Sequence, residues 1–330
     1  MKTSKKYLLL VAILAVVTVA SIYYVAEAGS NIDSFPESYQ SYLEELQKKY
    51  PNWNFVPLNT NLDWNTVIDA ENKFGKNLVP KSYSDAWKNM TPGEYNVEVD
   101  AGWVDCSRRA IEYTMDPRNF LNEVRIFQFE GLSYEENTNS LEGIEKILYG
   151  TEFYNRIVEY KTTAGNTVTM SSKYSDLIAT AGKESKVSSY HLASRIKQEV
   201  GPFLSHSSIS GIVPGFEGYY NFYNLGAWSS CANPIDCAID FASGYSGRYS
   251  SYNRPWTNPE IAIKGGAKYL ADGYINKRQN TLYFQKWDVV NYNGNFNHQY
   301  MTNIKAAINE GKNTWKSYKN INVLSKQIEF

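Results

Sequence analysis

The amino-acid sequence predicts a mainly helical α+β chain, and two observations carry this expectation. Apolar residues recur at helical spacing in successive segments of the 330 residues, each bounded by Gly, Pro or capping residues. A stretch rich in Ser, Gly, Tyr, Asn and Pro, residues 203–258, interrupts these segments, and within it only residues 209–213 alternate as a strand does. Loops on a helical scaffold often carry function, so a site is expected in this stretch.

The helices follow in chain order. Residues 29–60 are expected to form a helix and then an extended stretch, with Pro51 ending the helix. Asp116 before Pro117 is typical of a capped helix start. Residues 164–166 indicate a turn or linker. The other segments with helical spacing are residues 62–74, 133–150 with a continuation over 153–160, 172–181, 188–200, 261–274 and a last helix that begins at 301.

The N-terminus has the pattern of an export segment. Three Lys residues accompany an apolar run over residues 7–25, and Ala26-Glu27-Ala28 is a small-x-small cleavage pattern. The run is also nearly long enough to span a bilayer, so residues 1–28 are expected to be a signal peptide or a membrane anchor. Both alternatives predict that the remaining chain works outside the membrane.

Composition and motifs exclude several classes of function. Without residues 1–28 the net charge is −3, which offers no electrostatic footprint for nucleic acid. The three His residues are scattered, and neither a metal-hydrolase motif nor a nucleotide-binding glycine motif occurs, so we expect no metal and no cofactor. The 27 Tyr residues suit carbohydrate stacking, although aromatic residues are also ordinary core residues.

Three Cys residues are too few for a disulfide framework. Cys231 and Cys237 lie close together in a loop-like stretch and could form a small disulfide in an oxidising compartment. Cys106 then lacks a partner, and we expect it to be a buried small hydrophobe. A cysteine peptidase built on Cys231 and His298 is disfavoured, because Cys231 has a nearer disulfide partner.

Glu199 is the candidate acid of the chain. Ser188 or Ser189 can cap a helix over residues 190–200, and Glu199 shares the apolar face of that helix. Gly201 then stands where a helix commonly ends. The negative end of the helix dipole and apolar surroundings both disfavour an ionised carboxylate, which suits a general acid.

A competing interpretation of Glu199 stays open from the residues alone. Arg195 lies one helical turn earlier and could pair with Glu199, which would favour the ionised form. A helix-end Glu with a solvated head and no chemistry is equally an ordinary feature of helices.

Five short blocks resemble one family of enzymes. They cover about residues 170–310 and are similar to bacterial endo-β-N-acetylglucosaminidases of glycoside hydrolase family 73, above all to clostridial autolysins. The segment DPRNF at 116–120 is less specific and resembles the longer members. The blocks read LASRIKQEVG at 192–201, YNFYNLGA at 220–227, AIKGGAKYL at 262–270, TLYFQKW at 281–287 and HQYMTN at 298–303.

The resemblance implies a lysozyme-like domain with a small β-hairpin lobe, and hydrolysis of the N-acetylglucosaminyl-β-1,4-N-acetylmuramic acid bond of peptidoglycan. It puts Glu199 at the general-acid position. The second group stays open between Glu217, expected in the hairpin lobe, and the acetamido group of the substrate. Asp236 is the next candidate, with a helix N-terminal acid as the simpler interpretation. Tyr300 matches a position near the acid, where its hydroxyl would stabilise an oxazolinium-like intermediate or position water.

The aromatic and amide stretch after the acid is expected to bind the glycan strand. In an extended segment alternate side chains face opposite ways, and the sequence does not say which face is wet. Tyr252 is a looser candidate for an outer subsite. The expected substrate-binding residues are Tyr220, Phe222, Tyr223, Asn224, Gly226, Trp228 and Trp256.

Two other functions compete with a glucosaminidase. A muramidase or lytic transglycosylase would use the same scaffold, and a non-catalytic glycan-binding protein would keep the aromatic residues without chemistry. The expected partner is a peptidoglycan glycan strand, bound by a monomer at the cell wall or surface of a Gram-positive bacterium. The expected divisions are residues 1–28, a mostly helical N-terminal region over 29–165 that could pack on the rest, a catalytic domain over 166–320, and a tail over 321–330.

Overall fold

The computed structural model describes residues 32–227, 231–290, 293–318 and 327–329. Helices dominate, and the described strands form three small sheets, so the predicted mainly helical α+β class is confirmed. Among the described helices none is long and apolar enough to cross a bilayer. The expected export segment, residues 1–28, lies outside the described residues.

The N-terminal region contains short helices that close on one apolar core. They are α2 (Glu37–Lys49), α3 (Trp64–Glu71) and α4 (Arg108–Met115). The extended stretch predicted after the first helix is strand β1 (Asn54–Val56), which pairs in parallel with β7 (Gln327–Glu329). A three-stranded antiparallel sheet has the order β2-β4-β3, from Leu78–Pro80, Trp103–Asp105 and Glu98–Asp100.

Capping residues set several helix ends. Asp63 accepts a hydrogen bond from the Thr66 N–H and starts α3, and Asp116 does the same for the 3₁₀ helix η3 (Pro117–Phe120) through Arg118 N–H. The predicted cap at Asp116 is therefore confirmed, on a 3₁₀ rather than an α-helix. Helix α5 (Leu141–Leu148) is shorter than its prediction of 133–150, because Ser140 caps it.

The segment predicted to continue as a helix over 153–160 is instead the first strand of a hairpin. Strand β5 (Ile157–Lys161) pairs antiparallel with β6 (Thr167–Lys173) around the turn predicted at 164–166. The helical prediction was wrong because pairing with β6 selects a strand, which the β-branched Ile157 and Val158 accommodate well. Burial alternates along the strand, with Val158 buried and both its neighbours exposed.

This hairpin is the small β-lobe, but it does not lie where it was expected. Residues 207–210 form the short helix α8 (Ser207–Ser210), and the 211–220 segment that carries Glu217 is a loop. That loop packs on the turn of the hairpin, since a Cβ on Gly218 would overlap the backbone of Thr162 and Thr163.

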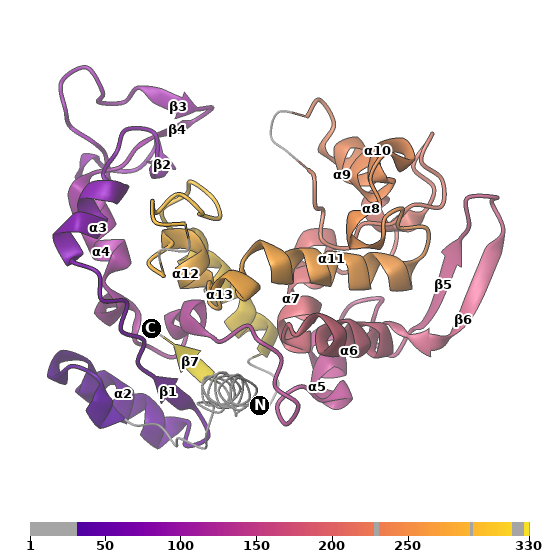
Figure 1. Ribbon diagram of the computed structural model, residues 1–330, viewed down its shortest axis with the longest axis horizontal. Helices are drawn as coiled ribbons and strands as arrows, with labels where there is room; N and C mark the ends of the chain where they lie inside the picture. Colours follow the sequence, from indigo (N-terminus) through magenta and orange to yellow (C-terminus); the bar gives the residue numbers. More distant parts are fainter. Residues whose placement is uncertain (1–31, 228–230, 291–292, 319–326, 330) are drawn as a thin grey trace, which may run out of the picture.

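The longer helices in the rest of the described chain are α6 (Tyr174–Ser185), α7 (Ser189–Val200), α9 (Pro234–Ala242), α11 (Pro259–Gly273), α12 (Leu282–Trp287) and α13 (Ala306–Tyr318). A one-turn helix, α10 (Gly244–Gly247), follows α9. Figure 1 shows α2–α4 with the β2–β4 sheet on one side, α8–α10 with the β5–β6 hairpin on the other, and α11–α13 between them. The last helix starts at Ala306 rather than at 301, because Met301 has a φ of 66° that no right-handed helix contains.

One apolar core runs through both sides of the molecule. Its members extend from Phe35 to Tyr318, and α13 packs on the 3₁₀ helix η4 (Arg125–Phe129) of the N-terminal region. Helix α5 packs on both α6 and α7 in the same way. The N-terminal region and the last helix are therefore joined by continuous packing. The boundary at residue 165 remains a prediction.

The cysteines follow their expectations. Cys231 and Cys237 form a disulfide that joins the segment before α9 to the first turn of that helix, and Cys106 is a free thiol buried in the core. Burial raises the pKa of the Cys106 thiol, with nearby Asp105 adding to the effect, so this cysteine is an inert core residue.

Candidate active site

Helix α7 carries Glu199 in its last turn. Ser188 caps the start of the helix by accepting a hydrogen bond from the His191 N–H. At the other end Gly201 has a φ of 70°, a conformation that glycine adopts without strain, and Pro202 follows. These neighbouring residues therefore set where the helix stops, a short way after Arg195.

Arg195 is the centre of the polar groups around Glu199. Its Nη2 lies 3.0 Å from Oε1 of Glu199 and donates to the Tyr300 hydroxyl at 3.0 Å. Its Nη1 lies 2.8 Å from Oε2 of Glu310, a residue of α13. The Tyr300 ring lies beneath the guanidinium, 5.4 Å from its central carbon. We call Arg195, Glu199, Tyr300 and Glu310 the Arg195 cluster.

The cluster is buried on one side and open on the other. The side chains of Arg195 and Glu310 are 10% and 13% exposed, whereas that of Glu199 is 27% exposed. Glu199 is thus the carboxylate that a ligand can reach, and Glu310 stands behind it.

Burial and neighbouring charges shift the pKa values of three members of the Arg195 cluster. Burial raises the pKa of Glu310; Arg195 opposes this and the charge of Glu199 adds to it. Arg195 itself loses hydration on burial, but Glu310, Tyr300 and Glu199 more than compensate, so its pKa is raised and it stays protonated. Burial also raises the pKa of Tyr300. One fixed cation is therefore shared by two acids.

Asn224 holds the backbone at the end of α7. Its Nδ2 donates to the carbonyl oxygen of Glu199 at 2.7 Å, which satisfies a group that the helix end leaves free. Its own φ is 48°, a left-handed conformation that Asn tolerates. Within the described residues its buried Oδ1 has no hydrogen-bond partner. Asn224, predicted as a sugar ligand, thus contacts the acid's backbone in this structure.

Most of the aromatic residues predicted to bind the glycan are core residues instead. Four of these aromatic rings are at most 2% exposed, so none of them has a face open to a sugar. Their polar tips are taken up inside the fold: the Tyr220 hydroxyl donates to the Lys161 carbonyl at 2.7 Å, and the Trp256 indole donates to the Tyr252 carbonyl at 2.8 Å. The buried rings are those of Tyr220, Phe222, Tyr223 and Trp256.

This correction has a physical reason. The segment is an irregular, tightly turned loop rather than a strand with one wet face, so alternation does not apply to it. Gly226, predicted as a substrate-binding residue, is buried, and a Cβ there would overlap Phe241. Trp228 lies outside the described residues.

The two candidates for a second catalytic group, Glu217 and Asp236, make no described contact with the Arg195 cluster. Glu217 is exposed, and its Oε1 accepts a hydrogen bond from the Gly215 N–H at 3.2 Å. Asp236 is an exposed residue in the first turn of α9, as its simpler interpretation held. His206 caps α8 close enough to Glu199 to sense its charge, although burial lowers the pKa of this imidazole.

Glu310 is the residue that sequence reasoning missed. It is 115 residues from Arg195 in the chain, and nothing in its local pattern separates it from an ordinary helix Glu. The signal available was indirect, since an Arg on a buried helix face needs acids to pair with. In the described part of the chain no group of three His, Cys, Asp or Glu side chains could hold a metal ion.

Comparison with known proteins gives relatives of one kind. No protein-family model matches the chain. A β-N-acetylglucosaminidase of Bacillus subtilis (strain 168) is 26% identical over 225 residues, which are 67% of this chain and 22% of that protein. A bifunctional autolysin of Staphylococcus epidermidis is 34% identical over 89 residues, 27% of this chain and 6% of that protein. The chain thus matches less than a quarter of the length of these relatives.

Solved structures agree on the fold. Glucosaminidase B of S. aureus superposes with a TM-score of 0.55 at 23% identity, covering 84% of this chain and 92% of that one. A major bifunctional autolysin superposes with a TM-score of 0.53 at 20% identity, covering 84% and 96%. The described chain therefore has the fold of these glucosaminidase structures, and the resemblance seen in the sequence is confirmed by relatives that bear those names.

Proposed function

We propose that this protein is a peptidoglycan hydrolase that cleaves the N-acetylglucosaminyl-β-1,4-N-acetylmuramic acid bond. The observation that carries the proposal is the match over 225 residues to a protein named β-N-acetylglucosaminidase. The partly exposed Glu199 at the end of α7 supports it, because glycoside hydrolysis needs one carboxylic acid beside the scissile bond.

Glu199 acts as general acid in this proposal. Its carboxyl group gives a proton to the glycosidic oxygen as the bond to the sugar carbon breaks, and the leaving sugar departs as an alcohol. Arg195 fixes the position of the carboxylate between turnovers. Glu310 contacts the same guanidinium, so the charge of Arg195 is divided between two carboxylates.

The second catalytic role falls to Glu217 or to the acetamido group of the substrate. In the first case the carboxylate activates water or attacks the sugar, and in the second the acetamido oxygen attacks and forms an oxazolinium-like intermediate. The Tyr300 hydroxyl, held by Arg195, would then stabilise that intermediate or position water. Replacement of Glu217 by Gln separates the two, since only the first mechanism loses most of its rate.

The primary test is hydrolysis of purified cell walls by Glu199→Gln. The amide keeps the shape of the side chain but has no proton to give, so we expect a fall in kcat of about a hundredfold or more. Glu44→Gln is the control, because Glu44 is an exposed acid on α2. Activity equal to wild type in the Glu199→Gln variant would exclude the proposed acid.

Product analysis separates the competing functions. N-acetylglucosamine at the new reducing ends supports the proposal, while muramic or anhydromuramic ends indicate a muramidase or a lytic transglycosylase. Binding without any new reducing ends indicates a non-catalytic glycan-binding protein. The proposed setting is the outer surface or wall of a Gram-positive cell, with residues 29–165 packed on a catalytic domain over 166–320.

A further inference from the structure

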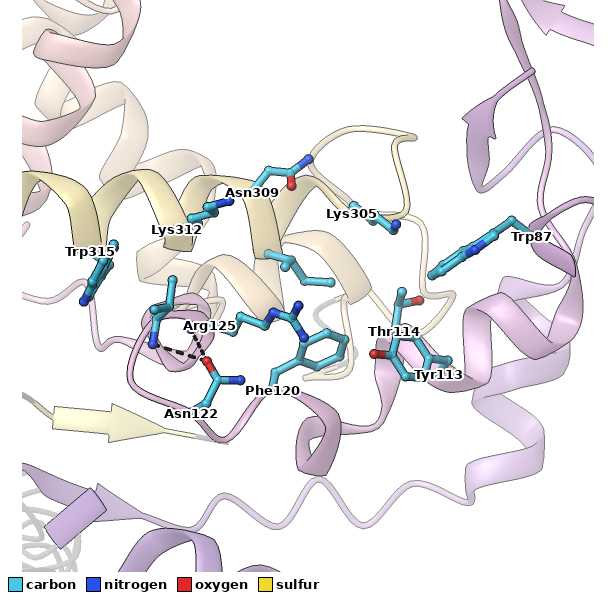
Figure 2. Close-up of a pocket in the computed structure, with 12 residues that line it drawn as sticks. Trp87, Tyr113, Thr114, Phe120, Asn122, Arg125, Lys305, Asn309, Lys312 and Trp315 are labelled. Atoms are coloured by element: carbon cyan, nitrogen blue, oxygen red, sulfur yellow. Dashed lines mark hydrogen bonds between the residues drawn. The ribbon is translucent and has the colours of Figure 1, made fainter. Parts of the chain in front are cut away.

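A second site is built on the far side of α13. A pocket of about 840 Å³ lies between α13, the segment from η3 to η4, and α4. Figure 2 shows Trp87 and Lys305 at one end, Trp315 at the other, and Phe120 with Arg125 between them. Its volume is in the range of ordinary small-molecule sites.

The pocket is cationic. Arg125, Lys305 and Lys312 line it, and no acidic side chain does. Within the described residues none of the three makes an ion pair with a carboxylate; Lys305 is half-buried, and Arg125 and Lys312 are exposed. In a protein of net charge −1, three uncompensated cations around one pocket make a local attraction for an anion.

An aromatic wall accompanies these charges. The rings of Trp87 and Tyr113 meet edge to face at 5.9 Å, and those of Tyr113 and Phe120 at 5.6 Å. Of these rings Tyr113 is exposed to solvent, whereas Phe120 is buried and supports it. The Lys305 ammonium lies 3.9 Å from the centre of the Trp87 ring, which fixes that cation at the pocket edge. Flat aromatic faces with a polar edge are the surfaces on which sugar rings stack.

Amide groups complete the lining. The Oδ1 atom of Asn122 accepts hydrogen bonds from the N–H groups of Val124 and Arg125, as the dashed lines in Figure 2 show. Its Nδ2 has no partner in the described chain and is available as a donor. Asn309 is exposed on α13 and adds a second amide.

We propose that this pocket binds a negatively charged saccharide, a sugar ring that carries a phosphate or a carboxylate. Arg125 and Lys312 pair with the anion, because Arg and Lys make charge-assisted hydrogen bonds to such groups. The exposed Tyr113 ring takes the sugar ring, and the amides bind its hydroxyl groups. A nucleic-acid strand is disfavoured, because the positive charge is confined to one pocket and does not form a track.

The pocket is separate from the Arg195 cluster. Ile308, Asn309, Lys312 and Trp315 form one stripe along α13 that faces the pocket. At about 100° per residue, Glu310 points to the opposite side of the helix from the midpoint of this stripe. A ligand in the pocket therefore does not contact the proposed acid, and binding there does not depend on hydrolysis.

Calorimetric titration of the full chain tests the inference. The probes are N-acetylglucosamine 6-phosphate, N-acetylmuramic acid, neutral N-acetylglucosamine and inorganic phosphate. We expect at least one charged sugar to bind about tenfold more tightly than both the neutral sugar and phosphate. The first two probes distinguish a phosphate-bearing from a carboxylate-bearing ligand.

A variant with Arg125→Gln and Lys312→Gln should weaken binding of the charged sugar about tenfold or more. The matched control is Lys48→Gln with Lys73→Gln, which removes two exposed charges elsewhere and should leave the affinity within about twofold. Equal affinity of the pocket variant and the control would overturn the inference. So would inorganic phosphate binding as tightly as the better-binding of the two charged sugars.

Discussion

Replacement of Glu310 by Gln is expected to change the pH dependence of hydrolysis without unfolding the protein. Glu310 and Glu199 contact the same guanidinium of Arg195, at 2.8 and 3.0 Å. In the variant the whole charge of Arg195 compensates Glu199 alone, and one like charge near Glu199 is gone. Both changes make the surroundings of the proposed acid more positive, so the alkaline limb of the pH–rate profile should move to lower pH.

The size of this effect follows from Coulomb's law. Two unit charges about 4 Å apart interact by about 1 kcal/mol in water and about 4 kcal/mol at an effective dielectric constant of about 20. Glu199 is 27% exposed, so we take the lower part of this range. An interaction of about 1.4 kcal/mol corresponds to one pH unit. The alkaline limb of the pH–rate profile should therefore move down by about one unit.

Stability provides the internal control. Because burial raises the pKa of Glu310, its contribution to stability is full at low pH and is lost as the pH rises through the raised value. Gln imitates the protonated, neutral form of Glu310, and Glu199 remains as a partner of the buried Arg195, so the variant should stay folded in urea titration at pH 7 with a somewhat lower free energy of unfolding. The assay is kcat/KM on purified cell walls from pH 4 to 9, with Glu44→Gln alongside. An alkaline limb at the wild-type pH in a folded variant would refute the reasoning.

Three more perturbations test other parts of the structure. Burial lowers the pKa of Lys286 to about 8 from an ordinary 10.5, so the free energy of unfolding should rise from pH 7 to pH 10. In urea unfolding, Lys286→Met should remove about 2 kcal/mol of that rise. The same loss in Lys73→Met would contradict this explanation. Tyr300→Phe should lower kcat about tenfold or more with little change in stability, and an unchanged kcat would exclude a role for the hydroxyl. In thermal unfolding, Gly218→Ala should lower the free energy of unfolding by about 2 kcal/mol more than Gly215→Ala does. Both glycines have a φ of 80°, but only Gly218 is packed against backbone. Equal losses in the two variants would contradict this packing.

Local signals allowed parts of the fold to be predicted. The cap at Ser188 and the stop at Gly201 are set by neighbouring residues, so helix α7 was predicted within a residue or two at each end. The hairpin at 157–173 was misjudged, although its turn was found, because a short apolar run does not distinguish helix from strand. The choice there is made by pairing with β6, which lies outside the local pattern.

Of the Arg195 cluster, the sequence predicted Glu199, its helix neighbour Arg195, and Tyr300 near the acid. Tyr223 and Trp256 are residue types that commonly stack on sugars, but tertiary packing buries both rings in the core. Glu310 has no local signature, since its role comes from the contact of α13 with α7. Residue type predicts what a side chain can bind, and only the fold decides whether it faces solvent, an ion pair or the core.

The surroundings of Glu199 depend on the N-terminal region, although no residue of that region touches the acid in the contacts described. Arg195 is oriented by Glu310, and Glu310 is carried by α13. Helix α13 can approach η4 closely because Gly311 has no side chain; a Cβ there would overlap the backbone at Gln128. Residues 125–129 thus fix the position of α13, α13 fixes Glu310, and Glu310 holds the guanidinium that positions the proposed acid. A larger side chain at Gly311 would therefore displace α13 and, through Glu310, the guanidinium of Arg195 on α7. The N-terminal region thus helps to hold the residues of the candidate site in position.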